Sequence, residues 1–242
     1  MENNIKKSTD QLIPYQWFWT DIFGRRMSFI DIIKSRKFTF LYLAIIWGII
    51  GILGFASTQI DNCDKSWQLA FSCDQAIWMI KMIDQPLIFA RSLITAAFFH
   101  NGLDHILFVS IFGMLFPVQS FEVQHGWKPT AIIFLSTYVF IGIYSGLLFN
   151  IGIAYWPNNE FFIFGFERSW LGGSVGFYAL IGAMAFQSRK KWVLIFLTAC
   201  FEVINLTVIG IDVHITFIHI HCTFYGFFMS WWLTKKGTIK SI

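Results

Sequence analysis

The stretch "FTFLYLAIIWGIIGILGFAS", residues 38–57, runs for twenty residues without a charged side chain. At a rise of about 1.5 Å per residue, a helix of this length crosses the hydrocarbon core of a bilayer. Five further apolar stretches follow it along the chain. The six predicted spans are residues 38–57, 92–118, 129–153, 173–187, 192–211 and 214–233.

The composition supports a membrane protein. Charged residues make up only 13% of the 242 residues, whereas an average soluble domain carries about 25%. The spans lack the alternating pattern of a barrel strand, and lipid leaves no water to satisfy an open backbone, so the spans are predicted to be helices. We therefore predict an all-α membrane protein with one helical bundle over residues 38–233.

The two ends of the chain are predicted to be short flanking segments. Residues 1–37 include "PYQWFWTDIFGRR", residues 14–26, which mixes aromatic and basic side chains. Such a mixture is typical of a segment that rests on the membrane surface. Residues 234–242 form a short basic tail.

The basic residues predict the orientation. With the amino terminus in the cytoplasm, 14 of the 18 Lys and Arg residues fall on the cytoplasmic side, and four fall outside: Lys65, Lys81, Arg91 and Arg168. Cytoplasmic loops carry the excess of basic residues, so both termini are predicted to be cytoplasmic. The net charge of +4 is then explained by topology, and we expect no nucleic-acid partner.

The four cysteines divide into two pairs by position. Cys63 and Cys73 fall in the first external loop, where they could form a disulfide in an oxidising compartment or remain two free thiols. Cys200 and Cys222 lie within predicted spans and are expected to be small buried residues.

One serine stands in the run "WLGGSVGFYALIGA", residues 170–183, among apolar and small residues. Ser174 opens the fourth predicted span, near its external end, with glycines on both sides. Glycines allow tight turns and expose backbone N–H groups, but they also allow two helices to touch. Ser174 is therefore either a nucleophile or a packing residue, and a nearby base decides between the two.

The sixth span offers that base. His219, Cys222, Gly226 and Ser230 follow one another at helical spacing and share a face of mostly small residues, which lets a neighbouring helix come close. His221 lies about 200° around the helix from His219 and points elsewhere. His219 is therefore the best candidate for a general base.

Four motifs in order resemble the rhomboid family of intramembrane serine proteases: "HNGLDHILF", "FEVQHG", "GGSVGFYALIG" and "IHIHCTFYGF". The resemblance covers residues 95–229 and implies a six-transmembrane-helix rhomboid-like bundle. It implies that Ser174 is the nucleophile, that His219 is its base and that Tyr178, one turn from Ser174, supports His219. It places the remaining candidates around the oxyanion and the site: His105, His100, Gly172 and Gly173.

The resemblance also implies the activity. It predicts hydrolysis of peptide bonds in or near transmembrane segments of other membrane proteins, which reach the site laterally from the lipid bilayer. No metal, nucleotide or other cofactor is expected, and no oligomeric state is indicated. We expect a multi-pass protein of the plasma (inner) membrane of a prokaryote.

Three positions depart from the family pattern and keep other functions open. Val109 stands in place of an asparagine, Val175 in place of a glycine after the serine, and Cys222 in place of a glycine. One alternative is a catalytically silent rhomboid-like protein that binds transmembrane helices. Another is a metal site or transporter that uses His219 with Cys222, prompted also by Glu202 in the fifth span.

Overall fold

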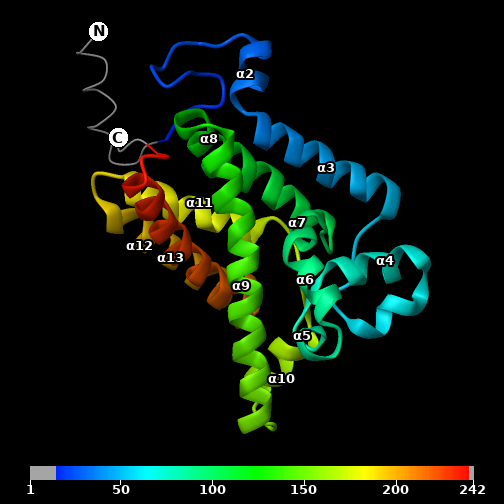
Figure 1. Cartoon of the computed structure of the whole chain (residues 1–242). Coiled ribbons are helices and arrows are strands. Elements are labelled where there is room, and N and C mark those ends of the chain that lie inside the picture. The colour runs from blue at the N-terminus through cyan, green and yellow to red at the C-terminus, as the bar shows by residue number, and fades with distance from the viewer. Residues whose placement is uncertain (1–14, 240–242) are drawn as a thin grey trace. The chain divides into compact units, whose positions relative to one another are not determined.

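The computed structural model describes residues 15–239 (Figure 1). Residues 1–14 of the predicted surface segment and residues 240–242 of the predicted tail lie outside this range. The described chain forms two compact units. Unit 1 comprises residues 15–43, 109–137 and 174–239, and unit 2 comprises residues 44–108 and 138–173.

Helices occupy the predicted apolar segments. Those that follow the predicted bounds within a few residues are α3 (Lys37–Leu53), α9 (Trp127–Tyr155), α11 (Ser174–Gln187), α12 (Lys191–Ile204) with the π-helical η4 (Asn205–Ile209), and α13 (Val213–Lys235). The first predicted span ends early because the chain leaves the helix at Gly54, whose φ of +78° favours glycine.

Three helical segments of the described range are long and apolar enough to cross a membrane: Leu103–His125, Trp127–Tyr155 and Lys191–Ile209. A fourth crossing is added if α2 (Phe29–Ser35) and α3, which meet at an angle of 88°, count as one bent span. The helix α11 has only 14 residues. Helix length and hydropathy thus give three or four crossings within residues 15–239, and the number of six stays a prediction.

The second predicted span, residues 92–118, is wrong at both ends. The helices α6 (Pro86–Thr95) and η2 (Ala96–Phe98) stop at Phe99, whose backbone is extended. A new helix then runs through α7 (Leu103–Phe108), the π-helical η3 (Val109–Val118) and α8 (Gln119–His125). The wider π-helical turn accommodates Pro117, which has no N–H to donate, so the helix continues past residue 118.

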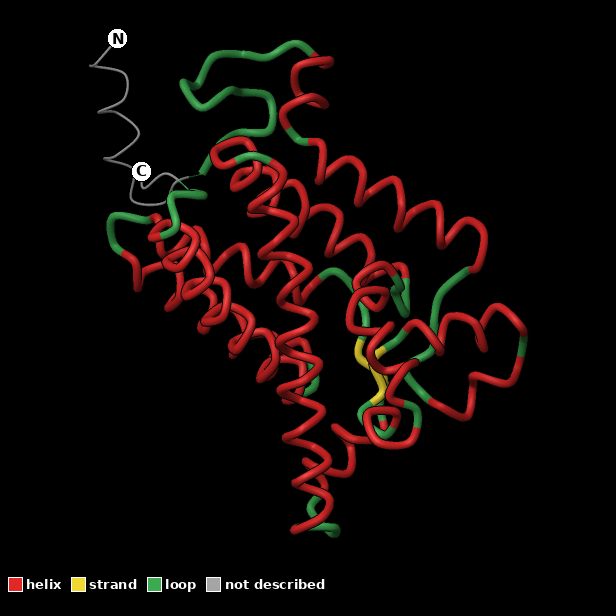
Figure 2. Tube along the Cα trace, in the orientation of Figure 1, coloured by secondary structure: helices red, strands yellow, loops and turns green. Residues whose placement is uncertain are grey.

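Unit 2 also contains short elements that the sequence did not indicate. They are η1 (Ile60–Lys65), α4 (Trp67–Gln75), β1 (Ile77–Trp78), α5 (Lys81–Asp84), α10 (Glu160–Glu167) and β2 (Ser169–Trp170). The two strands pair antiparallel, with Ile77 opposite Trp170 (Figure 2).

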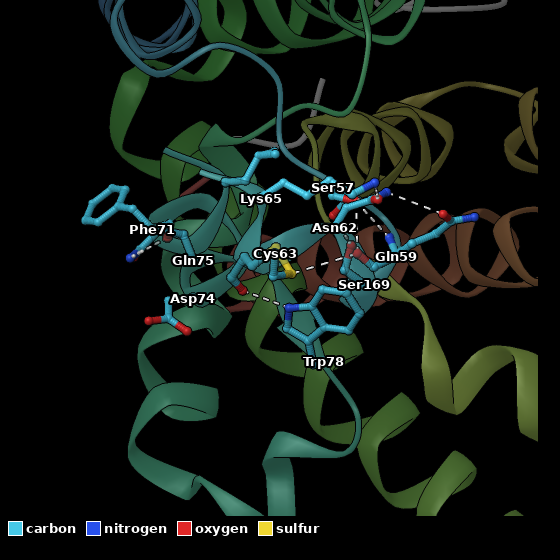
Figure 3. Close-up of a disulfide and its surroundings, with 12 residues drawn as sticks. Ser57, Gln59, Asn62, Cys63, Lys65, Phe71, Asp74, Gln75, Trp78 and Ser169 are labelled. Carbon is cyan, nitrogen blue, oxygen red and sulfur yellow. Dashed lines mark hydrogen bonds between the residues drawn. A yellow bond between two sulfur atoms is a disulfide. The ribbon is translucent and has the colours of Figure 1, made fainter. Parts of the chain in front are cut away.

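A disulfide between Cys63 and Cys73 joins η1 to α4 and resolves the alternative that the sequence left open (Figure 3). The indole Nε1 of Trp78 donates a hydrogen bond of 2.7 Å to the carbonyl of Cys73. Trp78 is fully buried beside the disulfide, so the loop has a small apolar core of its own. Of the other two cysteines, Cys222 is buried and Cys200 half-buried.

In unit 1, the start of α3 is fixed by α8. The carboxylate of Glu122 accepts hydrogen bonds from the amides of Phe38 and Thr39, at 2.6 and 2.9 Å, and from the Thr39 hydroxyl at 2.8 Å. The buried Arg36 donates to Gln119 at 2.7 Å. A carboxylate that caps the first amides of a helix satisfies donors that otherwise have no partner.

The tightest packing in unit 1 joins α11 to α13. A Cβ on Gly226 would lie 2.7 Å from Cα of Ala179, and a Cβ on Gly182 would lie against the backbone carbonyl of Thr223. Only glycine at both positions allows the two backbones to touch, as small residues do between membrane helices. The small-residue face predicted for residues 219–230 is therefore the face that α11 covers.

Candidate active site

Ser174 is the first residue of α11 and is 7% exposed. The first N–H groups of a helix have no partner inside the helix and carry the positive end of its dipole. Tyr178 follows one turn later on the same face and is buried. The start of α11 therefore presents a hydroxyl together with backbone donors.

His219 reaches this part of α11 from α13. Its ring stacks on the ring of Tyr178 with centroids 3.9 Å apart and planes 11° from parallel. His219 is only 6% exposed. The glycine contacts described above hold the two helices at this separation, so the rings of Tyr178 and His219 meet.

No hydrogen bond joins the Ser174 hydroxyl and the His219 ring within residues 15–239. Such bonds are often long without a substrate and shorten when one binds. The structure brings both residues to the facing sides of two packed helices, and the assignment of their roles remains a prediction.

The other four predicted site residues form a group within unit 2. His100 is 1% exposed and lies in the turn before α7, and His105 lies half-buried on α7. Their ring centroids are 5.1 Å apart. The amide of Gly173 donates to Nε2 of His100 at 3.2 Å, so His100 holds the backbone that leads into Ser174.

Gly172 makes the sharp turn in this segment. Its φ is +99°, and a Cβ there would lie against the ring of His105. Its amide donates to the carbonyl of Ala96 at 2.9 Å, and its carbonyl accepts from the Tyr138 hydroxyl at 2.5 Å. Since the amides of Gly172 and Gly173 already have partners, the amide of Ser174 is the next one along the chain that can serve a ligand.

The family described as Rhomboid domain matches residues 90–236. The chain belongs to the rhomboid family. Rhomboid proteins are generally intramembrane serine proteases, and with its long apolar helices this rhomboid protein is an integral membrane protein. Comparisons with curated proteins and with solved structures give no match.

Two of the departures from the rhomboid pattern lie in unit 1 as buried apolar side chains. Val109 is fully buried in η3 and Val175 is 8% exposed, so neither can donate to an oxyanion. In unit 2, Oδ1 of Asn101 lies 2.9 Å from Nδ1 of His105. Asn101 therefore orients His105. Its side-chain oxygen accepts a hydrogen bond from Nδ1 of His105, both when the neutral ring carries its proton on Nδ1 and when the ring is doubly protonated.

The sequence pointed to Glu202 as a candidate residue but not to Tyr178 and His219 as its hydrogen-bond partners. Its Oε1 accepts a hydrogen bond from the Tyr178 hydroxyl and lies 3.2 Å from Nδ1 of His219. The side-chain Nδ2 of Asn205, three residues later, donates a hydrogen bond of 3.3 Å to the same oxygen. The only sequence signal for this contact was the presence of a carboxyl group within a predicted span. An ionisable group inside a membrane indicates a candidate functional site.

Of the residues that prompted the metal alternative, Glu202 lies beside His219. His221 turns away from His219, and its Nδ1 lies 2.8 Å from the carbonyl of Phe217, one turn earlier on α13. Within residues 15–239, no three His, Cys, Asp or Glu residues lie together in a way that could hold a metal ion.

Proposed function

We propose that this rhomboid protein is an intramembrane serine endopeptidase that uses Ser174 and His219 to hydrolyse peptide bonds in or near transmembrane segments of other membrane proteins. The observation that carries the proposal is the stacking of Tyr178 on His219 at 3.9 Å, one turn from Ser174 and within the matched rhomboid domain. A structural serine would require no buried histidine held against the same helix face.

The roles of the residues follow serine-protease chemistry. A serine is a weak nucleophile until a base takes its proton, and His219 is that base. The tetrahedral intermediate needs fixed donors for its negative charge, and each donor typically changes the rate by about 10²- to 10³-fold. By resemblance to the family, His105 lines the oxyanion hole. The amide of Ser174, at the positive end of the α11 dipole, is the backbone donor.

The remaining residues shape the site. Gly172 gives the turn before the nucleophile, and His100 holds the amide of Gly173. Tyr178 restricts the plane of the His219 ring. The reaction needs no cofactor, because the nucleophile, the base and the oxyanion donors all come from the chain.

The membrane arrangement belongs to the same proposal. A bundle of six crossings over residues 38–233, with both termini in the cytoplasm, places most basic residues inside. The disulfide of the first loop then lies outside the cytoplasm, where disulfides persist. Substrates enter from the bilayer, and the protein acts in the plasma membrane of a prokaryote.

A fluorophosphonate probe tests the proposal, because it reacts only with an activated serine. The purified full chain in detergent is expected to carry one adduct, on Ser174, as located by mass spectrometry of the digested protein. The Ser174→Ala and His219→Ala variants are expected to lose it. A folded wild-type protein without this adduct would instead favour the catalytically silent rhomboid-like protein.

A further inference from the structure

Glu202 carries a carboxyl group buried inside unit 1. The roles proposed above for Ser174 and His219 do not involve it. It lies on α12 with no exposed surface. Removing a carboxylate from water is costly unless hydrogen bonds replace the lost hydration, and the cost is greater in a membrane segment. The motifs shared with the rhomboid family assign it no role.

Two partners of Glu202, Tyr178 and His219, belong to the proposed active site. The oxygen Oε1 accepts a hydrogen bond from the Tyr178 hydroxyl on α11 and lies 3.2 Å from Nδ1 of His219 on α13. It also accepts a hydrogen bond of 3.3 Å from the side-chain Nδ2 of Asn205. Donors from three helical segments converge on one oxygen, which is the environment of an ionised acceptor.

The carboxyl group and the tyrosine constrain His219 in different ways. A stacked ring fixes the plane of the imidazole but permits a half-turn about the Cβ–Cγ bond, which returns the ring to the same plane with Nδ1 and Cδ2 exchanged. An acceptor at Nδ1 selects one of the two orientations and keeps the proton on Nδ1. Nε2 is then unprotonated and free to act as a base.

We propose that Glu202 is a positioning residue for His219 and completes a triad of Ser174, His219 and Glu202. The inference rests on the proposed protease function and deepens it. Glu202 holds the reactive tautomer of His219 and stabilises the imidazolium ion that forms during the reaction, as the acidic member of a Ser-His-Asp triad does.

The proton balance is that of acyl transfer. The Ser174 hydroxyl oxygen bonds to the carbonyl carbon, its proton moves to Nε2 of His219, and the carbonyl electron pair moves to oxygen. When the oxyanion collapses, the peptide C–N bond breaks and Nε2 gives its proton to the leaving nitrogen. Water then repeats the sequence on the acyl-enzyme, and Glu202 stays ionised throughout.

The test compares three variants of the full chain in detergent. Glu202→Gln keeps the shape but removes the charge, and Glu202→Asp keeps the charge on a shorter arm. Asn205→Ala is the matched control, because it removes another donor from the same oxygen without touching His219. The readout is the rate of fluorophosphonate labelling of Ser174 over a range of probe concentrations.

Loss of the acidic charge in a Ser-His-Asp triad lowers the catalytic rate by about 10⁴-fold. Tyr178 still restricts the ring here, so we expect Glu202→Gln to lower the maximal labelling rate by about 10²-fold or more, with an unchanged half-saturating probe concentration. Glu202→Asp is expected to recover part of the rate, and Asn205→Ala to stay close to wild type. A purely structural role predicts instead that Glu202→Gln and Asn205→Ala lose thermal stability without a selective loss of rate.

A second readout does not depend on proteolysis. Nitrogen NMR of protein labelled in its histidine rings is expected to show His219 protonated on Nδ1 in the wild type and a mixture of tautomers in Glu202→Gln. If Glu202→Gln does not fold, the wild-type spectrum decides alone: a proton on Nε2 overturns the inference. Equal maximal labelling of wild type and Glu202→Gln overturns the triad and leaves the protease intact, whereas an unlabelled wild type overturns both.

Discussion

The substitution Gly226→Ala probes how closely α11 and α13 approach. The added Cβ would lie 2.7 Å from Cα of Ala179, and closer still to the carbonyl group of Ala179. Carbon atoms in contact are normally about 3.5–4.0 Å apart, so the helices must separate by about 1 Å. Overpacking of this kind costs about 1–3 kcal/mol.

The same shift reaches the site, because Tyr178 is the neighbour of Ala179 on α11. A displacement of about 1 Å can cost about 10²-fold in rate. We therefore expect Gly226→Ala to lower the rate of Ser174 labelling by about 10- to 100-fold. The melting temperature is expected to fall by about 2–12 °C, at about 2–4 °C per kcal/mol for a chain of this size.

Gly51→Ala is the matched control. Gly51 also lies inside a helix, α3, but a Cβ there meets no atom within 4 Å. Alanine is favoured over glycine in a helix by up to about 1 kcal/mol, so this variant is expected to be as stable as wild type or more so. If Gly226→Ala matches Gly51→Ala in thermal melts and in labelling rate, α11 and α13 do not pack as described.

Three further substitutions give sharp expectations. Tyr178→Phe keeps the stacked ring but loses the hydroxyl that donates to Glu202. A hydrogen bond to a charged group is worth about 1.5–3 kcal/mol, so labelling of Ser174 is expected to slow about tenfold or more. An unchanged labelling rate would show that the hydroxyl has no part in the site. Gly172→Ala forces a side chain onto the ring of His105 at a φ of +99°, so both labelling and thermal stability are expected to fall, and a wild-type melting curve would contradict the turn. Cys73→Ser opens the disulfide and is expected to cost about 2–4 kcal/mol in thermal stability while Ser174 is still labelled at low temperature; no change in melting would mean that the bond does not form.

The sequence predicted what depends on local periodicity. The face of α13 that carries His219 and Gly226 follows from helical spacing, and so does the position of Tyr178 one turn from Ser174. These features depend only on a helix and a neighbouring helix. Apolar spans that contain small residues predicted both.

What the sequence could not predict depends on contacts between distant segments. Glu202 lies 17 residues before His219, and only the packing of α12 against α13 brings the two together. The break at Phe99 is an exception, because it has a local signal: the polar residues His100 and Asn101 and then Gly102 directly follow the end of η2. The disulfide required the fold of the loop, since spacing alone left two free thiols equally acceptable.

The most direct test of the account is cleavage of a generic single-span substrate, reconstituted in liposomes with wild type, Ser174→Ala or His219→Ala. The account predicts that wild type releases a fragment cut in or near the transmembrane segment. Both variants are expected to leave the substrate intact while they remain folded. Undiminished cleavage by Ser174→Ala would contradict the central claim that Ser174 is the nucleophile.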